Sequence, residues 1–398
     1  MLLAASVVAQ PRPRARDLGI APGAMEPGPL NAITDVTGVL VGQTTIVNGD
    51  TVRTGVTAVL PHSGNLFRDK VPGAVFIGNA FGKLAGSTQV QELGTIESPI
   101  VLTNTLSVAA AMDATVRWTL AQPGNEQVRS VNALVGETND GGLNDIRGLH
   151  VTREHVTGAI TGAKAGEVAE GAVGAGTGTV AFGWKGGIGT SSRRVRQGQE
   201  TYTVGVLVQT NYGGKLTIAG VPVWKELSPR TPAPSPAPSA PTPLVPQHPL
   251  REPTPPSASV PPHPQRQYPA PSSLEADGSC MIVVATDAPL DARDLERLAA
   301  RAIFAMARTG STYSNGSGDF AIAFSTHPSL RVGSGAAPQQ KTVLPTDAVS
   351  GLFEATLDAT EEAIYNSLLK AVDTTGGGRT IRALPVEELR TLLKQHGR

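Results

Sequence analysis

Short runs of apolar residues, separated by glycine-rich or polar turns, recur along most of the chain. Short runs rich in Val, Ile and Leu are typical of buried β-strands. They predict strands at Val56–Leu60, Ala74–Ile77, Ile100–Thr103, Ala133–Val135, Val180–Trp184, Tyr202–Gln209, Cys280–Ala285 and Phe320–Phe324.

Apolar residues at helical spacing appear mainly toward the C-terminus. Between Asp291 and Arg308 they form one stripe that includes Leu295, Leu298 and Met306, as expected of a helix with one buried face. The same spacing predicts helices at 352–372 and 386–394, and a fourth at 106–120. Because strands are clustered and helices come late, we expect an α/β (α+β) fold with two packed sheets covered by helices, rather than regular βαβ alternation.

The composition argues against nucleic-acid binding, a disulfide framework and a membrane-spanning helix. The chain has 33 Lys plus Arg and 33 Asp plus Glu, so no overall charge attracts nucleic acid, and none is expected as a partner. One cysteine, Cys280, excludes an internal disulfide framework and a cysteine-rich metal site. No run of 18 apolar residues occurs, so we expect no membrane-spanning helix.

A proline-rich segment interrupts the pattern between Ser228 and Ser273. It contains 17 prolines in 46 residues, against 15 in the other 352. Such a segment forms neither a helix nor a central strand, and it predicts an extended, disordered linker. A ligand for SH3-type domains is the alternative.

Residues 1–20 leave two interpretations open. Met1 to Gln10 is apolar and passes through Val7-Val8-Ala9 before a basic stretch, which resembles a truncated secretory signal without its positive start. The other interpretation is a disordered start. The first predicts a periplasmic or secreted protein, and the second a cytoplasmic one.

Several familiar sites are absent from the sequence. It has no G-x-S-x-G elbow, no H-E-x-x-H and no G-x-x-x-x-G-K-[ST] loop, and its seven histidines form no metal-binding pattern. Gly174-Ala175-Gly176-Thr177-Gly178 lacks the preceding strand and following acid of a dinucleotide site, so we interpret it as a turn where backbones crowd. No cofactor or metal is expected.

Gly278 and Ser279 lie between the proline-rich segment and an apolar strand. A serine hydroxyl held against the preceding carbonyl can attack it, form an ester and hydrolyse to a new N-terminal serine. The α-amine of that serine titrates near 7.7–8.0, so it can take the proton from its own hydroxyl. The pair therefore predicts self-cleavage between Gly278 and Ser279.

The chain here resembles the self-processing L-aminopeptidase/D-amidase-esterases, a family of N-terminal-nucleophile-type serine peptidases that includes the β-peptidyl aminopeptidases. The resemblance covers most of the chain outside the proline-rich segment. It rests on Asn31-Ala32-Ile33-Thr34-Asp35-Val36, Ile77-Gly78-Asn79, Phe81-Gly82-Lys83, Gly86-Ser87-Thr88-Gln89-Val90, Leu102-Thr103-Asn104-Thr105, Gly136-Glu137-Thr138-Asn139-Asp140-Gly141, Gly183-Trp184-Lys185-Gly186-Gly187, Gln209-Thr210-Asn211-Tyr212-Gly213, Gly278-Ser279, Ala285-Thr286-Asp287-Ala288-Pro289-Leu290 and Gly316-Ser317-Gly318-Asp319.

The resemblance implies a four-layer αββα sandwich, like that of N-terminal-nucleophile hydrolases. One large domain would be cut into an α chain, 21–278, and a β chain, 279–398, and the processed units would assemble into an oligomer. The implied activity is a self-cleaving aminopeptidase or amidase that hydrolyses an N-terminal aminoacyl amide, ester or peptide bond. A related N-acetyl-amino-acid acyltransferase, whose nucleophile is Thr, and an inactive homologue are the alternatives.

The resemblance also implies the site residues. Ser279 matches the nucleophile, Asn211 the donor to the oxyanion, and Ser317 and Asp319 the residues that complete the catalytic site. Asp319 would orient Ser317 or bind the substrate ammonium, and it replaces the Glu that many relatives carry.

Four further residues bear on this site. Glu137 is a candidate anchor for the substrate ammonium, because a charged amine needs a carboxylate partner. Gly142 stands where we expect a Tyr in some relatives, which puts one oxyanion contact in doubt. We interpret Lys185 as structural, and Cys280 as a strand residue that points away from Ser279.

Overall fold

Two sheets form the centre of the protein, shown as a computed structural model that describes residues 12–229, 278–333, 335 and 337–398. The first sheet has the strand order β1-β2-β6-β7-β4. Its strands are β1 (Leu40–Asn48), β2 (Val52–Leu60), β4 (Leu84–Ala85), β6 (Ile100–Asn104) and β7 (Leu134–Thr138).

The second sheet follows the path β10-β11-β12-β13-β3-β14, with β5 paired to β3. These strands are β3 (Asp69–Ala80), β5 (Thr95–Ile96), β10 (Gly187–Gln197), β11 (Glu200–Asn211), β12 (Ser279–Thr286), β13 (Gly318–Ser325) and β14 (Val332–Gly333). Two short hairpins lie outside the sheets: β8 (Val180–Ala181) with β9 (Trp184–Lys185), and β15 (Thr374–Gly376) with β16 (Arg379–Ile381).

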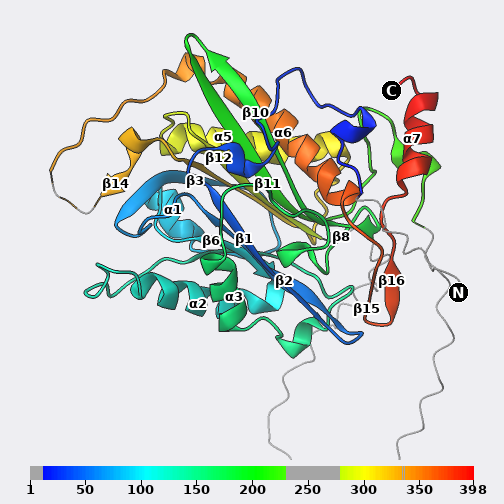
Figure 1. The fold of residues 1–398 in the computed structure, drawn as a ribbon, viewed down its shortest axis with the longest axis horizontal. Coiled ribbons are helices and arrows are strands. Elements are labelled where there is room, and N and C mark those ends of the chain that lie inside the picture. The colour runs from blue at the N-terminus through cyan, green and yellow to red at the C-terminus, as the bar shows by residue number, and fades with distance from the viewer. Residues whose placement is uncertain (1–11, 230–277, 334, 336) are drawn as a thin grey trace, which may run out of the picture.

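Helices cover the outer face of each sheet (Figure 1). Helices α2 (Val108–Leu120) and α3 (Arg153–Thr161) contact the first sheet, and α5 (Ala292–Thr309) and α6 (Ser350–Leu369) contact the second. The shorter helices are α1 (Ser87–Leu93), α4 (Val223–Glu226) and α7 (Val386–Gln395). The arrangement is the αββα sandwich that the family resemblance implies.

Three apolar cores separate the four layers. Strand β12 contributes side chains to two of these cores, because every residue of Ser279–Thr286 is buried. Ile282 and Val284 join the core under α5 and α6, whereas Met281 and Val283 join the core between the sheets. Successive side chains of a strand point to opposite faces, so a continuous apolar run is what a strand covered on both sides requires.

Most predicted elements are present, but one prediction is wrong. Val180–Trp184, predicted as one strand, is two short strands joined by a turn at Phe182 and Gly183. Both turn residues have positive φ, 53° and 78°, a backbone conformation that ends an extended strand. Strand β10 was not predicted at all, because its sequence GIGTSSRRVRQ is largely polar.

The segment before residue 21 belongs to the packed structure from Arg12 onward, whereas the sequence analysis places 1–20 before the domain. The backbone N–H of Ala15 donates to Asn366 Oδ1 at 2.9 Å, and Arg16 pairs with Glu362 at 3.0 Å. Of the arginines that suggested a basic flank, Arg12 and Arg16 contact α6, and Arg14 pairs with Glu170. Residues 1–11 lie outside the described residues, and so does all of the predicted linker except Ser228 and Pro229.

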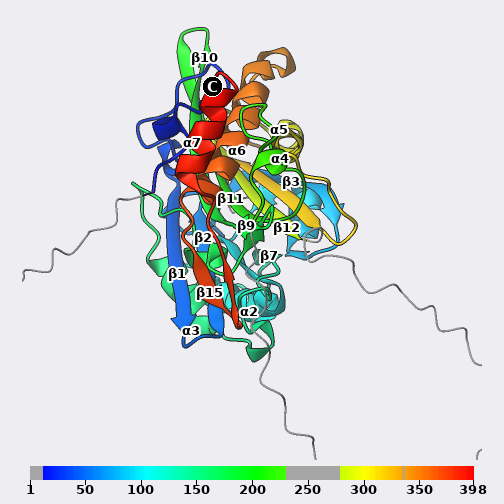
Figure 2. The same ribbon diagram turned by 90° about the vertical axis from the view of Figure 1, so that its right-hand side faces the viewer.

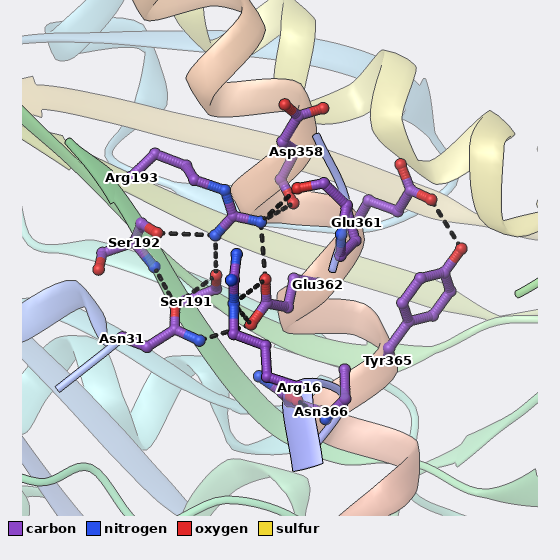
Figure 3. A network of polar contacts seen from close by, with 12 residues as sticks. Arg16, Asn31, Ser191, Ser192, Arg193, Asp358, Glu361, Glu362, Tyr365 and Asn366 are labelled. Atoms are coloured by element: carbon purple, nitrogen blue, oxygen red, sulfur yellow. Dashed lines mark hydrogen bonds and ion pairs between the residues drawn. The ribbon is translucent and has the colours of Figure 1, made fainter. Parts of the chain in front are cut away.

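A buried polar network holds this N-terminal segment to β10 and α6 (Figure 3). Arg193 on β10 contacts Glu362 on α6 at 2.6 Å, and neither side chain is exposed to solvent. Asn31 donates to Glu362 and accepts from Ser191 Oγ. Arg16, Asn31 and Arg193, which precede the proline-rich segment, thus satisfy the buried carboxylate of Glu362, which follows it, as a charge in the interior requires.

Candidate active site

The register of three neighbouring strands brings the predicted site together. Antiparallel pairing of β11 with β12 places Asn211 opposite Ser279. Parallel pairing of β12 with β13 places Gly318 on the other side of Ser279. Residues 211, 279 and 317–319, far apart in sequence, therefore meet at one end of the second sheet.

Ser279 is the first residue of the central strand β12 and is 5% exposed. Its Oγ accepts a hydrogen bond from the Gly318 N–H at 3.2 Å. Gly278 passes so close to β11 that a Cβ there would lie 2.0 Å from the Asn211 carbonyl oxygen. Glycine is required at 278 by this contact. Cys280 is fully buried in the core under α5 and α6.

Ser317 and Asp319 form a buried hydrogen-bonded pair beside the nucleophile. The Ser317 Oγ donates toward both carboxylate oxygens of Asp319, at 2.9 Å each, and Asp319 is completely buried. Burial raises the pKa of Asp319 to about 6, partly offset by the hydrogen bond from Ser317. Of the two roles considered for Asp319, this geometry matches the orientation of Ser317.

The side-chain amide of Asn211 has a defined direction. Its Oδ1 accepts a hydrogen bond from the Val180 N–H at 2.9 Å. An amide whose oxygen is held in this way turns its NH₂ group in the opposite direction, and Asn211 lines the cavity at Ser279. Asn211 can therefore offer a hydrogen-bond donor close to the nucleophile.

Glu137, at the end of β7, lines the same cavity although only 2% of it is exposed. One carboxylate oxygen accepts the Lys83 backbone N–H at 3.0 Å, and the other accepts the Thr105 hydroxyl. The Lys83 ammonium lies 3.7 Å from the first oxygen. These contacts fix a carboxylate at the cavity wall.

A cavity of about 570 Å³ opens onto Ser279. Its lining includes the predicted residues Ser279, Asn211 and Glu137 but not Ser317 or Asp319, which are buried. Gly142 also lines it, and a Cβ there would meet nothing nearer than Val180 at 3.9 Å. The place where we expect a Tyr in some relatives is open space in this protein.

Lys185 supports the loop that carries Val180. Its side chain is completely buried, and its ammonium donates to the carbonyls of Gly176, Thr179 and Gly186 at 2.8, 2.9 and 2.8 Å. Burial lowers the pKa of Lys185 to about 7, and the charge of Asp140 counteracts it. These contacts match the structural interpretation of Lys185.

The glycines before Lys185 crowd as expected. A Cβ on Gly176 would lie 2.5 Å from the Ile188 nitrogen, and one on Gly178 would lie 2.1 Å from the Arg53 carbonyl oxygen. The glycine-rich run at 174–178 is therefore a closely packed turn between the sheets.

Arg379 and Ile381 on the β15–β16 hairpin line the cavity but lie outside every motif and element of the sequence analysis. The only signal in the sequence is the turn Gly376-Gly377-Gly378 before them, which predicts a hairpin but not its place in the fold. The Gly318 N–H was also missed, since a backbone donor has no sequence signature.

Neither a metal centre nor a membrane helix was found in the part of the chain that the structure describes. Within it, no three His, Cys, Asp or Glu side chains are grouped as ligands for a metal ion. None of its helices is long and apolar enough to cross a membrane.

Two relatives named as aminopeptidases match nearly the whole chain. Beta-peptidyl aminopeptidase BapA of Sphingosinicella microcystinivorans is 41% identical over 100% of this chain and 96% of its own. The enzyme of the same name from Sphingosinicella xenopeptidilytica is 38% identical over 96% of this chain and 91% of its own.

Solved structures agree with the fold. The Burkholderia sp. beta-aminopeptidase has a TM-score of 0.80 and 36% identity, covering 97% of this chain and 99% of its own. The L-aminopeptidase D-Ala-esterase/amidase of Ochrobactrum anthropi, described as a variant of the Ntn hydrolase fold, has a TM-score of 0.81 and 34% identity with the same coverage. The model of peptidase family S58 matches residues 31–381. The chain therefore belongs to peptidase family S58 and is a serine aminopeptidase.

Proposed function

We propose that Ser279 is the nucleophile of this serine aminopeptidase and that it becomes the N-terminus of a second chain by self-cleavage after Gly278. The observation that carries the proposal is the register that sets Ser279 between Asn211 and Gly318. A serine at the first position of a central strand has its backbone nitrogen at the site, and that nitrogen is an α-amine once the chain is cut.

Self-cleavage would proceed through an ester. The Ser279 hydroxyl attacks the Gly278 carbonyl carbon, the C–N bond breaks, and the acyl group moves to Oγ while the nitrogen gains a proton. Water then hydrolyses the ester, which leaves a carboxylate on Gly278 and a free amine on Ser279. The contact of Gly278 with the Asn211 carbonyl supports this step, because it fixes the scissile unit beside the hydroxyl.

Substrate turnover uses the same atoms. Ser279 Oγ attacks the scissile carbonyl and passes its proton to the Ser279 α-amine, which returns it to the departing amine. Water hydrolyses the acyl-enzyme, releases the amino acid and restores the hydroxyl. The Asn211 NH₂ group stabilises the oxyanion, and the Ser317–Asp319 pair orients the groups beside the nucleophile.

The substrate is a small peptide or aminoacyl amide whose ammonium binds Glu137. A buried carboxylate on the cavity wall supports this assignment, because an ammonium leaving water needs a charged partner. Two relatives are named beta-peptidyl aminopeptidases, so a substrate panel should include β-linked, L-α and D residues.

Two variants test the proposal. Ser279→Ala should remain a single folded chain without hydrolytic activity, because the attacking atom is gone. Asn211→Ala keeps the nucleophile, so the chain should still be cut, while hydrolysis of an aminoacyl p-nitroanilide should fall by roughly 10²-fold or more. Intact mass and steady-state kinetics measure both. Cleavage after Gly278 in Ser279→Ala would contradict the assignment of Ser279 as the nucleophile. Hydrolysis at the parent rate in Asn211→Ala would contradict the assignment of Asn211 as the oxyanion donor.

We also propose that the processed units associate into a homo-oligomer and that the protein is exported to the periplasm. The oligomer is implied by the family resemblance, and light scattering tests it. Export is suggested by the apolar stretch ending near Ala9. Fractionation of native cells with N-terminal sequencing tests export, and activity confined to the cytosol with Met1 retained would contradict it.

A further inference from the structure

Arg379 is a half-buried cation in the active-site cavity, and no acidic side chain of the described residues pairs with it. It lies on β16 and lines the cavity together with Ser279 and Glu137. Within the residues that the structure describes, its guanidinium makes no hydrogen bond or ion pair. The other cation of the cavity, Lys83, is paired with Glu137 at 3.7 Å.

The hairpin that carries Arg379 is fixed in place. The Gly377 N–H donates to the Asp50 carbonyl oxygen at 2.9 Å, and a Cβ on Gly376 would lie 2.2 Å from the Leu143 carbonyl oxygen. Figure 2 shows the hairpin extending from the end of α7 toward the layer of α2 and α3. Its packing therefore holds Arg379 beside the stretch at Gly142 that also lines the cavity.

The two charges of opposite sign lie on different elements of the cavity wall. Glu137 is bound to Lys83 and Thr105, whereas Arg379 belongs to the hairpin packed on Leu143. Asn211 contacts Val180 and faces Ser279 across the β11–β12 register. The negative group thus lies with the β4–β7 end of the first sheet, and the positive group lies with the hairpin.

We propose that Arg379 binds the C-terminal carboxylate of a short peptide substrate. The inference rests on the proposed function: with the ammonium at Glu137 and the scissile carbonyl at Ser279, the departing residue extends into the rest of the cavity. A dipeptide carries a carboxylate on that residue. An arginine fork pairs with a carboxylate through two parallel hydrogen bonds, and the pairing is stronger where water is partly excluded.

The test compares a dipeptide acid with its C-terminal amide, which differ only in that carboxylate. The processed protein should hydrolyse the acid with a kcat/KM about tenfold higher than the amide, the scale of one charge-assisted hydrogen bond. Arg379→Ala should lose that preference, because the KM for the acid should rise by about tenfold, the scale of the lost charge-assisted hydrogen bond, while kcat/KM for the amide falls less. Arg379→Glu should prefer the amide.

Arg382→Ala is the matched control, because Arg382 is exposed, lies three residues further on and does not line the cavity. Equal kcat/KM for acid and amide in the parent protein, or an equal loss for both in Arg379→Ala, would overturn the proposal. Failure of the proposed function would give a different result: the parent protein would not hydrolyse the p-nitroanilide. In that case, calorimetric titration with the two peptides tests the role of Arg379, since the acid should bind more tightly than the amide.

Discussion

At the scale of single residues, the protonation of Asp319 should make kcat depend on pH. Its carboxylate accepts the Ser317 hydroxyl, and only the ionised form offers this acceptor without a competing proton. Burial raises the pKa of Asp319 to about 6, so the working form is lost as pH falls through about 6. We expect kcat to fall on that acidic limb.

The variants Asp319→Asn and Asp319→Glu isolate this effect. Asp319→Asn should lower kcat by about tenfold or more, the cost of a hydrogen bond to a charged group, and should remove the acidic limb near pH 6. Asp319→Glu keeps the charge and should keep the limb. The measurement is kcat against pH. If the decrease of kcat near pH 6 is unchanged in Asp319→Asn, another group causes it.

Several site residues could be predicted from the sequence, and others could not. Ser279 and Asn211 are in motifs that resemble the family's, so the sequence names them, and strand register explains why they meet. Arg379 is a lone arginine after a glycine turn. Nothing local indicates that its hairpin packs on Leu143, because that contact depends on the tertiary fold.

At the scale of elements, the turn that carries Val180 depends on one lysine. Lys185→Met would remove the ammonium that donates to the carbonyls of Gly176, Thr179 and Gly186. The Thr179 hydroxyl still donates to Gly176 and the Gly186 N–H to Thr179. The Gly186 carbonyl therefore loses its donor among the described residues, and one unpaired group costs about 1–3 kcal/mol. We expect a loss of about 1–3 kcal/mol in the free energy of unfolding. Activity of the folded fraction should also fall, because Val180 orients the Asn211 amide.

Lys164→Met is the control, since Lys164 is exposed on another loop. It should change the free energy of unfolding by no more than about 0.5 kcal/mol. Urea denaturation measures both variants. A Lys185→Met protein as stable as the Lys164→Met control would show that the turn holds without these bonds.

Elements with continuous apolar runs were the predictable ones. Strand β12 and helix α5 match their predicted ranges within two residues, because burial on two faces or on one stripe leaves a clear pattern. Strand β10 is buried along most of its length but has polar residues, since Arg193 and Ser191 serve the network with Glu362. Its burial follows from partners that are distant in sequence, so periodicity could not reveal it.

At the scale of the whole molecule, the two proposed chains interleave. Strands β12 and β13 follow the proposed cut, yet they lie between β11 and β3, which precede it. Glu362 follows the cut, whereas its partners Arg193 and Arg16 precede it. The two chains would therefore share one sheet and one buried ion pair.

Removing that carboxylate should weaken the whole assembly. Glu362→Ala leaves the Arg193 charge buried and unpaired, which costs about 3–5 kcal/mol in comparable cases. Glu387→Ala removes an exposed partner of Arg390 and should cost no more than about 0.5 kcal/mol. Thermal unfolding compares the variants. Equal midpoints would mean that the network contributes no net stability.

The interleaved sheet has a consequence for the lifetime of the enzyme. The precursor can fold as one chain, but after the cut a second folding would require two separate molecules to meet and reinsert β12 and β13 between β11 and β3. Refolding of Ser279→Ala from urea should therefore not depend on protein concentration, whereas the cut enzyme should recover poorly and in proportion to concentration. Processing would make folding an event that each molecule completes once, so its durability would depend on how slowly it unfolds rather than on equilibrium stability.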